Sequence, residues 1–250
     1  MIKVAVCGAN GKMGKEVCNA VNNEANMELT AKIDLFGDDT YKSIEQACQA
    51  CKFDVLVDFT QPSSIYENAK YCLNNNIKIV IGTTGLKDEQ IEELKNLSDK
   101  NSVSCLIAPN FSTGAVLMMM FARIASKYFD NAEIIELHHN RKKDAPSGTA
   151  IKTALMMSEA KDSFKSGNCA ETETITGARG GTSYSDIQIH SVRMPGYMAS
   201  QEVLFGSDGQ ILTIRHDSTD RKCYMAGVLL GINHVYNNND FIYGLENILQ

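Results

Sequence analysis

The sequence lacks a long uninterrupted apolar run. Its longest candidate, from Ala115 to Ile124, is interrupted by Arg123 and is shorter than the roughly 20 residues that cross a membrane. The first residues pass directly into a strand-like pattern, without the apolar segment and small-residue cleavage site of a secretory signal. We therefore expect a cytoplasmic protein with no membrane association.

An excess of positive charge is also missing. The chain has 24 Lys and Arg against 30 Asp and Glu, for a formal net charge of -6. An acidic chain of this size is a poor candidate for a general DNA or RNA binder, because phosphate contacts need basic side chains. Net charge says nothing about a single cleft, so a local basic pocket for a small anion stays open.

Cysteine motifs are scarce although the chain has eight cysteines. The one close pair is Cys48 and Cys51, which could be half of a zinc site or a redox motif. It lies in a helix-like segment with no second pair and no nearby histidine. We therefore expect reduced thiols and no bound metal.

Short apolar segments rich in β-branched residues alternate with helical patterns in the first part of the chain. The predicted strands are 2–7, 29–33, 55–59, 77–81 and 103–108. The predicted helices are 13–22, 43–50, 63–74 and 88–100. This alternation predicts an α/β fold, with a Rossmann-like parallel sheet covered by helices on both faces.

The pattern changes after Pro109. A long apolar helix over 114–129 is followed by successive strand patterns with short turns, which suggest antiparallel or mixed pairing in an α+β domain. A last helix over 223–235 is expected to pack back on the first domain. We therefore divide the 250 residues into a dinucleotide-binding domain, 1–109 plus 218–250, and an inserted domain, 110–217. The other elements expected after Pro109 are strands at 133–138, 185–193, 202–205 and 210–216 and a helix at 150–160.

A glycine-rich turn connects the first strand to the first helix. It consists of Gly8, Ala9, Asn10, Gly11, Lys12, Met13 and Gly14, with G-x-x-G-x-x-G spacing. Glycine allows a tight turn and a close approach to pyrophosphate, and the helix start favours negative charge. The turn therefore predicts dinucleotide binding, although three glycines alone are weak evidence.

Asp34 ends the second strand about 20 residues beyond this turn, where an acidic side chain can accept hydrogen bonds from ribose hydroxyls. The alternative is a simple turn or cap aspartate. Leu35 and Phe36 follow it, so the arginine that would bind a 2′-phosphate is missing. We therefore expect that NADH is favoured, or at least well used.

Two further loops follow the third and fourth strands, Phe59–Pro62 and Gly82–Gly85. Ligands bind at the carboxyl ends of parallel strands, so the small hydroxyl residues there could approach the nicotinamide ribose. Simple turn and cap sequences explain these loops equally well.

The segment Glu136–Thr149 combines two adjacent histidines, three basic residues and the sequence Pro-Ser-Gly-Thr before a helix. Ser147 and Thr149 are good capping residues, and a helix start binds anions. Histidine and lysine can supply protons, so this loop could bind carboxylates and act as an acid. The alternative is a solvated basic loop before a capped helix. A metal is not expected, because the adjacent lysines would repel a cation.

With this segment added, the chain resembles the 4-hydroxy-tetrahydrodipicolinate reductase (dihydrodipicolinate reductase) family along nearly its whole length. The matching stretches are VAVCGANGKMG, VDFTQPSS, IGTTG, APNFSTGAVL, ELHHNRKKDAPSGTA, HSVRMPG, EVLFG and LTIRHDSTDR. The string HH-x-x-K-x-DAPSGTA is highly specific to that family.

The resemblance implies NAD(P)H-dependent reduction of a small cyclic dicarboxylate in lysine and diaminopimelate biosynthesis. It also implies a homotetramer assembled through the second domain. The implied proton donors are His138 and Lys142, and the implied substrate-binding residues are His139, Gly148 and Thr149. The implied cofactor-binding residues are Gly8, Ala9, Asn10, Gly11, Lys12, Met13, Asp34, Gly82, Thr83, Thr84, Ala108, Pro109, Asn110 and Phe111.

Three positions depart from the family pattern. Ser200 stands where many relatives have a histidine, which weakens a catalytic role for that strand. Leu35 and Gln61 stand where some members have arginines, which puts the phosphate contacts of NADPH in doubt.

Two other functions remain open at this point. A nicotinamide-sensing regulator without catalysis would share the glycine turn and Asp34, but would not need the basic loop. A reductase of similar architecture could act on a different small acid.

Overall fold

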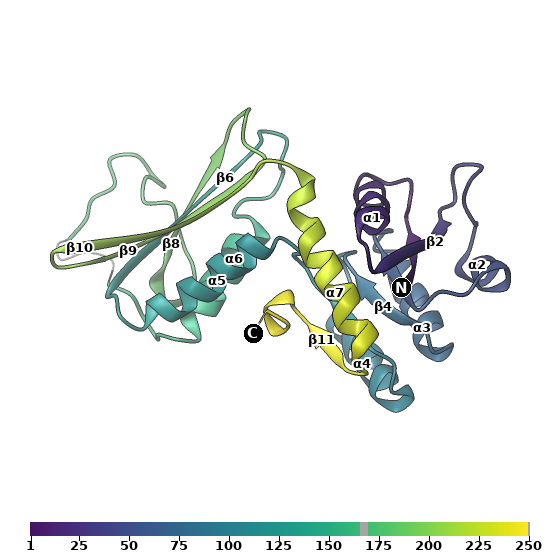
Figure 1. Cartoon of the computed structure of the whole chain (residues 1–250). Coiled ribbons are helices and arrows are strands. Elements are labelled where there is room, and N and C mark those ends of the chain that lie inside the picture. The colour runs from purple at the N-terminus through teal and green to yellow at the C-terminus, as the bar shows by residue number, and fades with distance from the viewer. Residues whose placement is uncertain (166–169, 250) are drawn as a thin grey trace. The chain divides into compact units, whose positions relative to one another are not determined.

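The structure is a computed structural model that describes residues 1–165 and 170–249. It divides into two compact units (Figure 1): unit 1 is Met1–Thr113 with Arg221–Gln250, and unit 2 is Gly114–Asp220. Within the described ranges, the search for a helix with the length and apolarity of a membrane span found none.

Unit 1 is built on a six-stranded parallel sheet of order β11-β5-β4-β3-β1-β2, which confirms the predicted Rossmann-like sheet. Its strands are β1 Ile2–Cys7, β2 Met27–Ile33, β3 Val55–Asp58, β4 Lys78–Ile81, β5 Cys105–Ile107 and β11 Phe241–Tyr243. The order in which the chain adds strands to the sheet reverses beside β1, because β2 lies on one side of it and β3 on the other. Such a switch point is where open α/β sheets bind ligands, at the carboxyl ends of the strands.

Helices cover both faces of this sheet, so its strand residues are apolar on both sides. One face packs on α2, α3 and α4 through a core that includes Leu56, Ile79, Ile65 and Leu94. On the other face α7 contacts β3, β4 and β5 and packs on α1 (Figure 1). The helices are α1 Lys12–Asn23, α2 Ile44–Ala50, α3 Ile65–Asn74, α4 Asp88–Asn101 and α7 Met225–Asn237. The expected return of the last helix to the first part of the chain is therefore confirmed.

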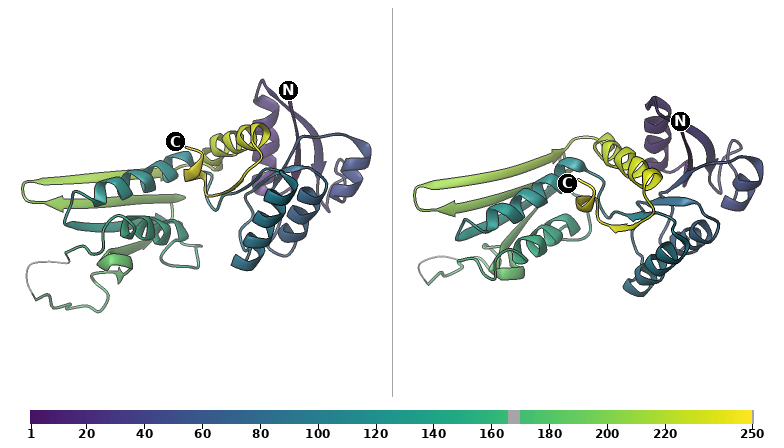
Figure 2. Two further views of the ribbon diagram at one scale, coloured as in Figure 1. Left: turned by 90° about the horizontal axis from the view of Figure 1, so that it is seen from below. Right: turned by 60° about the horizontal axis from the view of Figure 1, so that its bottom comes forward.

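Unit 2 is a five-stranded mixed sheet of order β10-β9-β6-β8-β7, in which β6 and β8 run parallel and the other pairs antiparallel. Its strands are β6 Asn131–His138, β7 Gly181–Thr182, β8 Gln188–Arg193, β9 Ala199–Ser207 and β10 Gln210–Ser218. Two helices, α5 Thr113–Ser126 and α6 Gly148–Ser158, cover one face of it (Figure 2). Their alanines pack on Ile134, Ile189, Val203 and Phe205.

Alternation along β6 decides which side chains the helices cover. Ala132, Ile134 and Glu136 are buried on the helix-covered face, whereas Glu133 is only partly buried on the opposite face. The buried carboxylate of Glu136 therefore lies among the β6 side chains that form the apolar core of unit 2. Short 3-10 turns complete the chain at η1 Tyr184–Asp186, η2 Arg221–Tyr224 and η3 Leu245–Asn247.

Candidate active site

The glycine turn of unit 1 has the close packing that only glycine allows. Gly8 has φ +76°, and a Cβ there would lie 2.4 Å from the carbonyl oxygen of Phe59. A Cβ on Gly14 would lie 2.0 Å from the carbonyl oxygen of Gly8. The turn therefore folds against itself and against the end of β3, and any side chain at either position would force the loop open.

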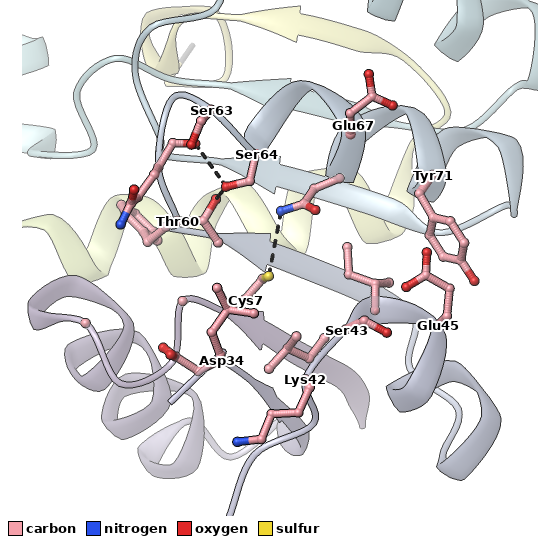
Figure 3. Close-up of a pocket in the computed structure, with 18 of the residues that line it drawn as sticks. Cys7, Asp34, Lys42, Ser43, Glu45, Thr60, Ser63, Ser64, Glu67 and Tyr71 are labelled. Carbon is pink, nitrogen blue, oxygen red and sulfur yellow. Dashed lines mark hydrogen bonds between the residues drawn. The ribbon is translucent and has the colours of Figure 1, made fainter. Parts of the chain in front are cut away.

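A cleft of about 930 Å³ opens beside this turn, at the switch point of the sheet (Figure 3). Its walls come from the β1–α1 turn, the end of β2, the loop after β3 and the exposed side of α3. Gly8, Asn10, Gly11 and Asp34 line it, so the structure brings these four predicted cofactor residues together. Figure 3 shows Asp34 and Lys42 on one side and Thr60 and Ser64 on the other.

The remaining glycine-turn residues have different surroundings. Ala9 is buried, whereas Lys12 is exposed and Met13 is partly exposed at the start of α1. The N-cap residue of α1 is Gly11, which has no side chain to cap the helix. No side-chain cap therefore covers the first-turn N–H groups, which are in the positions where a helix start can bind an anion.

Asp34 connects two loops of the cleft. Its carboxylate accepts hydrogen bonds from the N–H of Asn10 at 2.9 Å and from the N–H of Phe36 at 3.0 Å. The structure thus supports the turn interpretation of Asp34, and its place on the cleft wall also suits contact with a ribose. Sequence reasoning missed Lys42, an exposed cation on the same wall, because it follows Asp34 only after an intervening loop.

Asp58, at the end of β3, is a buried carboxylate that sequence reasoning did not single out. One oxygen accepts hydrogen bonds from the N–H and hydroxyl of Thr60, at 2.9 and 2.7 Å, and from the hydroxyl of Thr83 at 2.8 Å. The other accepts from the amide of Asn68 at 2.8 Å. Asp58 therefore ties the loops after β3 and β4 to α3. Its position in the sequence DFT at a predicted strand end was the available signal.

The predicted cofactor residues Gly82–Thr84 and Ala108–Phe111 also follow parallel strands, but they are not among the residues that line the cleft. Thr83 is buried against Asp58, whereas Thr84 is exposed. The ring of Phe111 packs on that of Phe59 with centroids 5.8 Å apart, and the side chain of Asn110 accepts from the N–H of Ser112. These residues shape the carboxyl edge of the sheet.

In unit 2, His138 ends β6 and is 14% exposed, with Nδ1 placed 2.5 Å from Oε2 of the buried Glu136. Arg193 on β8 donates to both oxygens of Glu136, at 2.9 and 2.6 Å. Burial by itself would raise the pKa of Glu136, but hydrogen bonds from His138, Arg193 and Ser191 outweigh it and lower the pKa to about 2. Glu136 is therefore a carboxylate at neutral pH. Neither Glu136 nor Arg193 was a predicted site residue.

The basic loop after β6 places Lys142 beside Asp144, with Nζ at 2.7 and 2.8 Å from the two carboxylate oxygens. This contact lowers the pKa of Asp144. His139 accepts a hydrogen bond at Nδ1 from the N–H of Arg141, at 3.2 Å. The lysine side chain is 20% exposed, so a cation lies partly enclosed in the same loop as His138.

Helix α6 begins at Gly148, two residues earlier than predicted. Ser147 is its N-cap, and its hydroxyl accepts from the N–H of Ala150 at 3.1 Å. Thr149 therefore lies in the first turn and is not the cap, because the tight turn at Ser147 already gives helical geometry from Gly148 on. The N–H groups of Gly148 and Thr149 are in the positions where a helix start binds a carboxylate.

Cys48, Cys51 and Ser200, which the sequence singled out without a site role, lie outside these two sites. Cys48 and Cys51 are free thiols on or next to α2, and burial raises the pKa of Cys48. Ser200 is buried on β9, and hydrogen bonds from Arg215 and Ser200 lower the pKa of Asp217. A search of the described residues for three or more His, Cys, Asp or Glu side chains placed to hold a metal found none.

The fold and these two sites define a class of two-domain proteins, in which a dinucleotide-binding α/β unit is combined with an α+β unit that carries acid–base side chains. Two family models match the chain, "Dihydrodipicolinate reductase, N-terminus" over residues 2–111 and "Dihydrodipicolinate reductase, C-terminus" over residues 114–249. The chain belongs to the dihydrodipicolinate reductase family, as its motifs suggested.

Similar proteins agree with this assignment. The chain is 48% identical to the 4-hydroxy-tetrahydrodipicolinate reductase of Gloeothece citriformis, over 99% of this chain and 98% of that one. It is 48% identical to the reductase of the same name from Streptococcus pneumoniae, with 99% of each chain covered. A solved structure of dipicolinate-bound dihydrodipicolinate reductase from Paenisporosarcina is 46% identical, with a TM-score of 0.93 and all of both chains covered. This family membership favours an enzyme over a sensor without catalysis.

Proposed function

We propose that this protein catalyses the NAD(P)H-dependent reduction of 4-hydroxy-tetrahydrodipicolinate to tetrahydrodipicolinate, a step of lysine and diaminopimelate biosynthesis. The observation that carries the proposal is the geometry of unit 2. There a histidine held by a buried carboxylate, a partly enclosed lysine and an anion-binding helix start belong to one connected segment. This segment lies within a chain nearly half identical to named reductases over its full length.

The residues of unit 1 fit a dinucleotide. The uncapped start of α1 and the tight turn at Gly8 suit a pyrophosphate, and Asp34 on the cleft wall suits the adenosine ribose. Ala9, Asn10, Gly11, Lys12 and Met13 complete the pyrophosphate loop. We assign Gly82–Thr84 and Ala108–Phe111 to the nicotinamide end, because they follow β4 and β5 at the carboxyl edge of the sheet.

The residues of unit 2 fit a cyclic dicarboxylate. The 4-hydroxyl group of the substrate leaves as water, and the cofactor, when bound, supplies hydride to the resulting unsaturated ring, which also takes up one proton. The N–H groups of Gly148 and Thr149 and the imidazole of His139 hold substrate carboxylate groups. Negative charge builds up on the substrate as it is reduced, and His138 and Lys142 stabilise this charge and donate the proton.

NADH is the favoured cofactor in this proposal, because Asp34 would repel a 2′-phosphate and Leu35 offers it no charge. Lys42 on the same wall is the group that could offset that repulsion. We expect Asp34→Ala to raise kcat/KM for NADPH relative to NADH, and Lys42→Ala to lower the use of NADPH alone. A wild-type enzyme with a large preference for NADPH would overturn the NADH assignment.

The homotetramer is proposed from the apolar surface of unit 2. Phe121 and Ile124 of α5 and Tyr128 just after it are exposed, and together with Leu212 and Ile214 of β10 they line a hollow of about 480 Å³. Exposed apolar patches of this kind mark protein interfaces. Light scattering coupled to gel filtration should give four times the 27.5 kDa of the chain. We place this enzyme in the cytoplasm, where its free thiols would stay reduced.

The proposed activity is tested by following NADH absorbance after purified protein is added to freshly prepared condensation product of pyruvate and aspartate semialdehyde. We expect rapid oxidation with this substrate and none without it. Repeating the assay with NADPH ranks the two cofactors. Binding of both cofactors without consumption of either would exclude the reductase and favour a sensor.

A further inference from the structure

Glu136 contacts both the proposed acid His138 and the N-cap residue Ser147 at the start of α6. It lies two residues before His138 on β6, and residues i and i+2 of a strand share a face. Arg193 stands opposite His138 in the parallel β6–β8 register, and its guanidinium reaches back to Glu136. Oε1 of Glu136 also accepts the N–H of Ser147, the cap residue of α6, at 3.2 Å.

We propose that Glu136 is a positioning residue that fixes the protonation geometry of His138 and couples it to the carboxylate-binding start of α6. This inference rests on the proposed function for the roles of His138 and α6. Glu136, held in place by Arg193, makes Nε2 the nitrogen of His138 that transfers the proton.

The assignment of Nε2 follows from which groups can donate. Glu136 is ionised, so both of its oxygens only accept hydrogen bonds. Nδ1 of His138, at 2.5 Å from one of them, must therefore carry a hydrogen in both the charged and the neutral imidazole. The proton that is gained and lost is then the one on Nε2.

Arg193 makes the burial of Glu136 possible. An isolated buried carboxylate would be too costly, and the two-pronged guanidinium contact offsets that cost. Arg193 also donates to the carbonyl oxygen of Asp144 at 2.8 Å, which ties the loop of Lys142 to the same cluster. The ionisable groups around Glu136 are therefore His138, Arg193 and, in the adjoining loop, Asp144 paired with Lys142.

The same strand offers a matched control. Glu133 also binds an arginine and a histidine, with 2.6 Å to Arg179 and 2.7 Å to His190, but its side chain is 30% exposed on the opposite face of the sheet. Glu133→Gln removes the same charge from the same strand without touching His138.

The kinetic test compares kcat and KM in Glu136→Gln, Glu136→Asp and Glu133→Gln. Without the carboxylate, the hydrogen on Nδ1 of His138 is no longer fixed, so kcat should fall in Glu136→Gln while KM for NADH stays unchanged. Glu136→Asp should restore most of the lost kcat, and Glu133→Gln should show no loss. An unchanged kcat in Glu136→Gln would overturn the proposal.

A second measurement needs no substitution of Glu136. Nitrogen-15 NMR of the neutral histidines distinguishes the two imidazole tautomers, and comparison with His138→Asn assigns the His138 signal. We predict hydrogen on Nδ1 in the wild-type protein, and hydrogen on Nε2 would overturn the inference. If wild-type protein failed to oxidise NADH but showed the predicted tautomer, the proposed function would fail and the positioning of His138 by Glu136 would stand.

Discussion

Asp58 in unit 1 and Glu136 in unit 2 are both fully buried carboxylates near the ends of strands, and both gather hydrogen-bond donors from several segments. Their partners differ in charge. Asp58 accepts from hydroxyl, amide and backbone donors, whereas Glu136 is bound by a guanidinium and an imidazole. Neutral donors make a scaffold whose charge does not change, whereas an imidazole makes a group that responds to the reaction.

The donors also differ in whether they can reverse. Hydroxyls can turn to donate or accept, and the amide of Asn68 can rotate to present its oxygen. The N–H of Thr60 can only donate, but it binds the oxygen of Asp58 that does not contact Asn68. The guanidinium of Arg193 and the N–H of Ser147 can only donate. The site in unit 2 should therefore tolerate substitution less well than the site in unit 1, and the predictions below test this difference.

The largest stability effect is expected for Arg193→Ala. It leaves Glu136 as a buried carboxylate without its main countercharge, and we expect the free energy of unfolding to fall by about 3–5 kcal/mol. Arg215→Ala is the control, because Arg215 pairs with Glu202 and Asp217 at 41% exposure and should cost at most about 1 kcal/mol. Urea denaturation at neutral pH measures both. Equal losses of unfolding free energy in the two variants would show that burial of the Glu136–Arg193 pair adds nothing to stability.

Acid should weaken the Glu136 cluster in a defined range of pH. The pKa of Glu136 is lowered from 4.5 to about 2 in the folded protein, so its contribution is complete above pH 4.5 and is lost as the pH falls towards 2. Integrated over that window, the contribution is about 3 kcal/mol. Glu136→Gln should flatten the dependence of stability on pH by that amount. Urea denaturation from about pH 5 to about pH 2 checks this expectation, and a Glu136→Gln stability curve parallel to that of the wild type would contradict it.

Neutralising the two carboxylates one at a time compares the sites directly. In Asp58→Asn the remaining oxygen can keep the Thr60 and Thr83 contacts while Asn68 rotates, so we expect a loss of about 1–2 kcal/mol. In Glu136→Gln the new NH₂ must face at least one donor that cannot reverse, so the loss should be larger. Urea midpoints at neutral pH decide between them. A more damaging Asp58→Asn would reverse the proposed contrast.

The smallest effect is expected from two helix caps, one in each unit. Ser147 caps α6 and Ser43 caps α2, each through its hydroxyl, so replacing either with alanine should cost about 1 kcal/mol. The caps should differ in function, because α6 begins in the proposed substrate site. We expect Ser147→Ala alone to raise KM for the substrate. Matching KM values in the two variants would argue against substrate binding at α6.

Sequence reasoning predicted the alternating elements of unit 1, because buried parallel strands appear as short apolar segments separated by helical patterns. It missed β7 and β11, which have two and three residues and too little pattern to recognise. It placed the start of α6 at Ala150, since the cap could be assigned only once the turn at Ser147 was seen. The short turns of unit 2 predict antiparallel or mixed strand pairing, and the sheet is mixed.

Local motifs located His138, Lys142 and the glycine turn, because each lies within a short stretch with its own chemical signature. Glu136 was visible in the sequence but had no stated role, since its partner Arg193 is 57 residues away. Asp58 escaped notice for the same reason, as its contact with Thr83 spans 25 residues. Pairing at long range depends on strand register, which a single sequence does not specify.

The most direct test of the account is NADH oxidation by wild-type protein and by His138→Ala, with NADH binding measured in parallel. We predict that both proteins bind NADH equally, that the wild type consumes it when substrate is added, and that the variant turns over at least about 100-fold more slowly. Unchanged turnover in His138→Ala would remove this histidine from the mechanism, and no turnover by the wild type would contradict the proposed reductase.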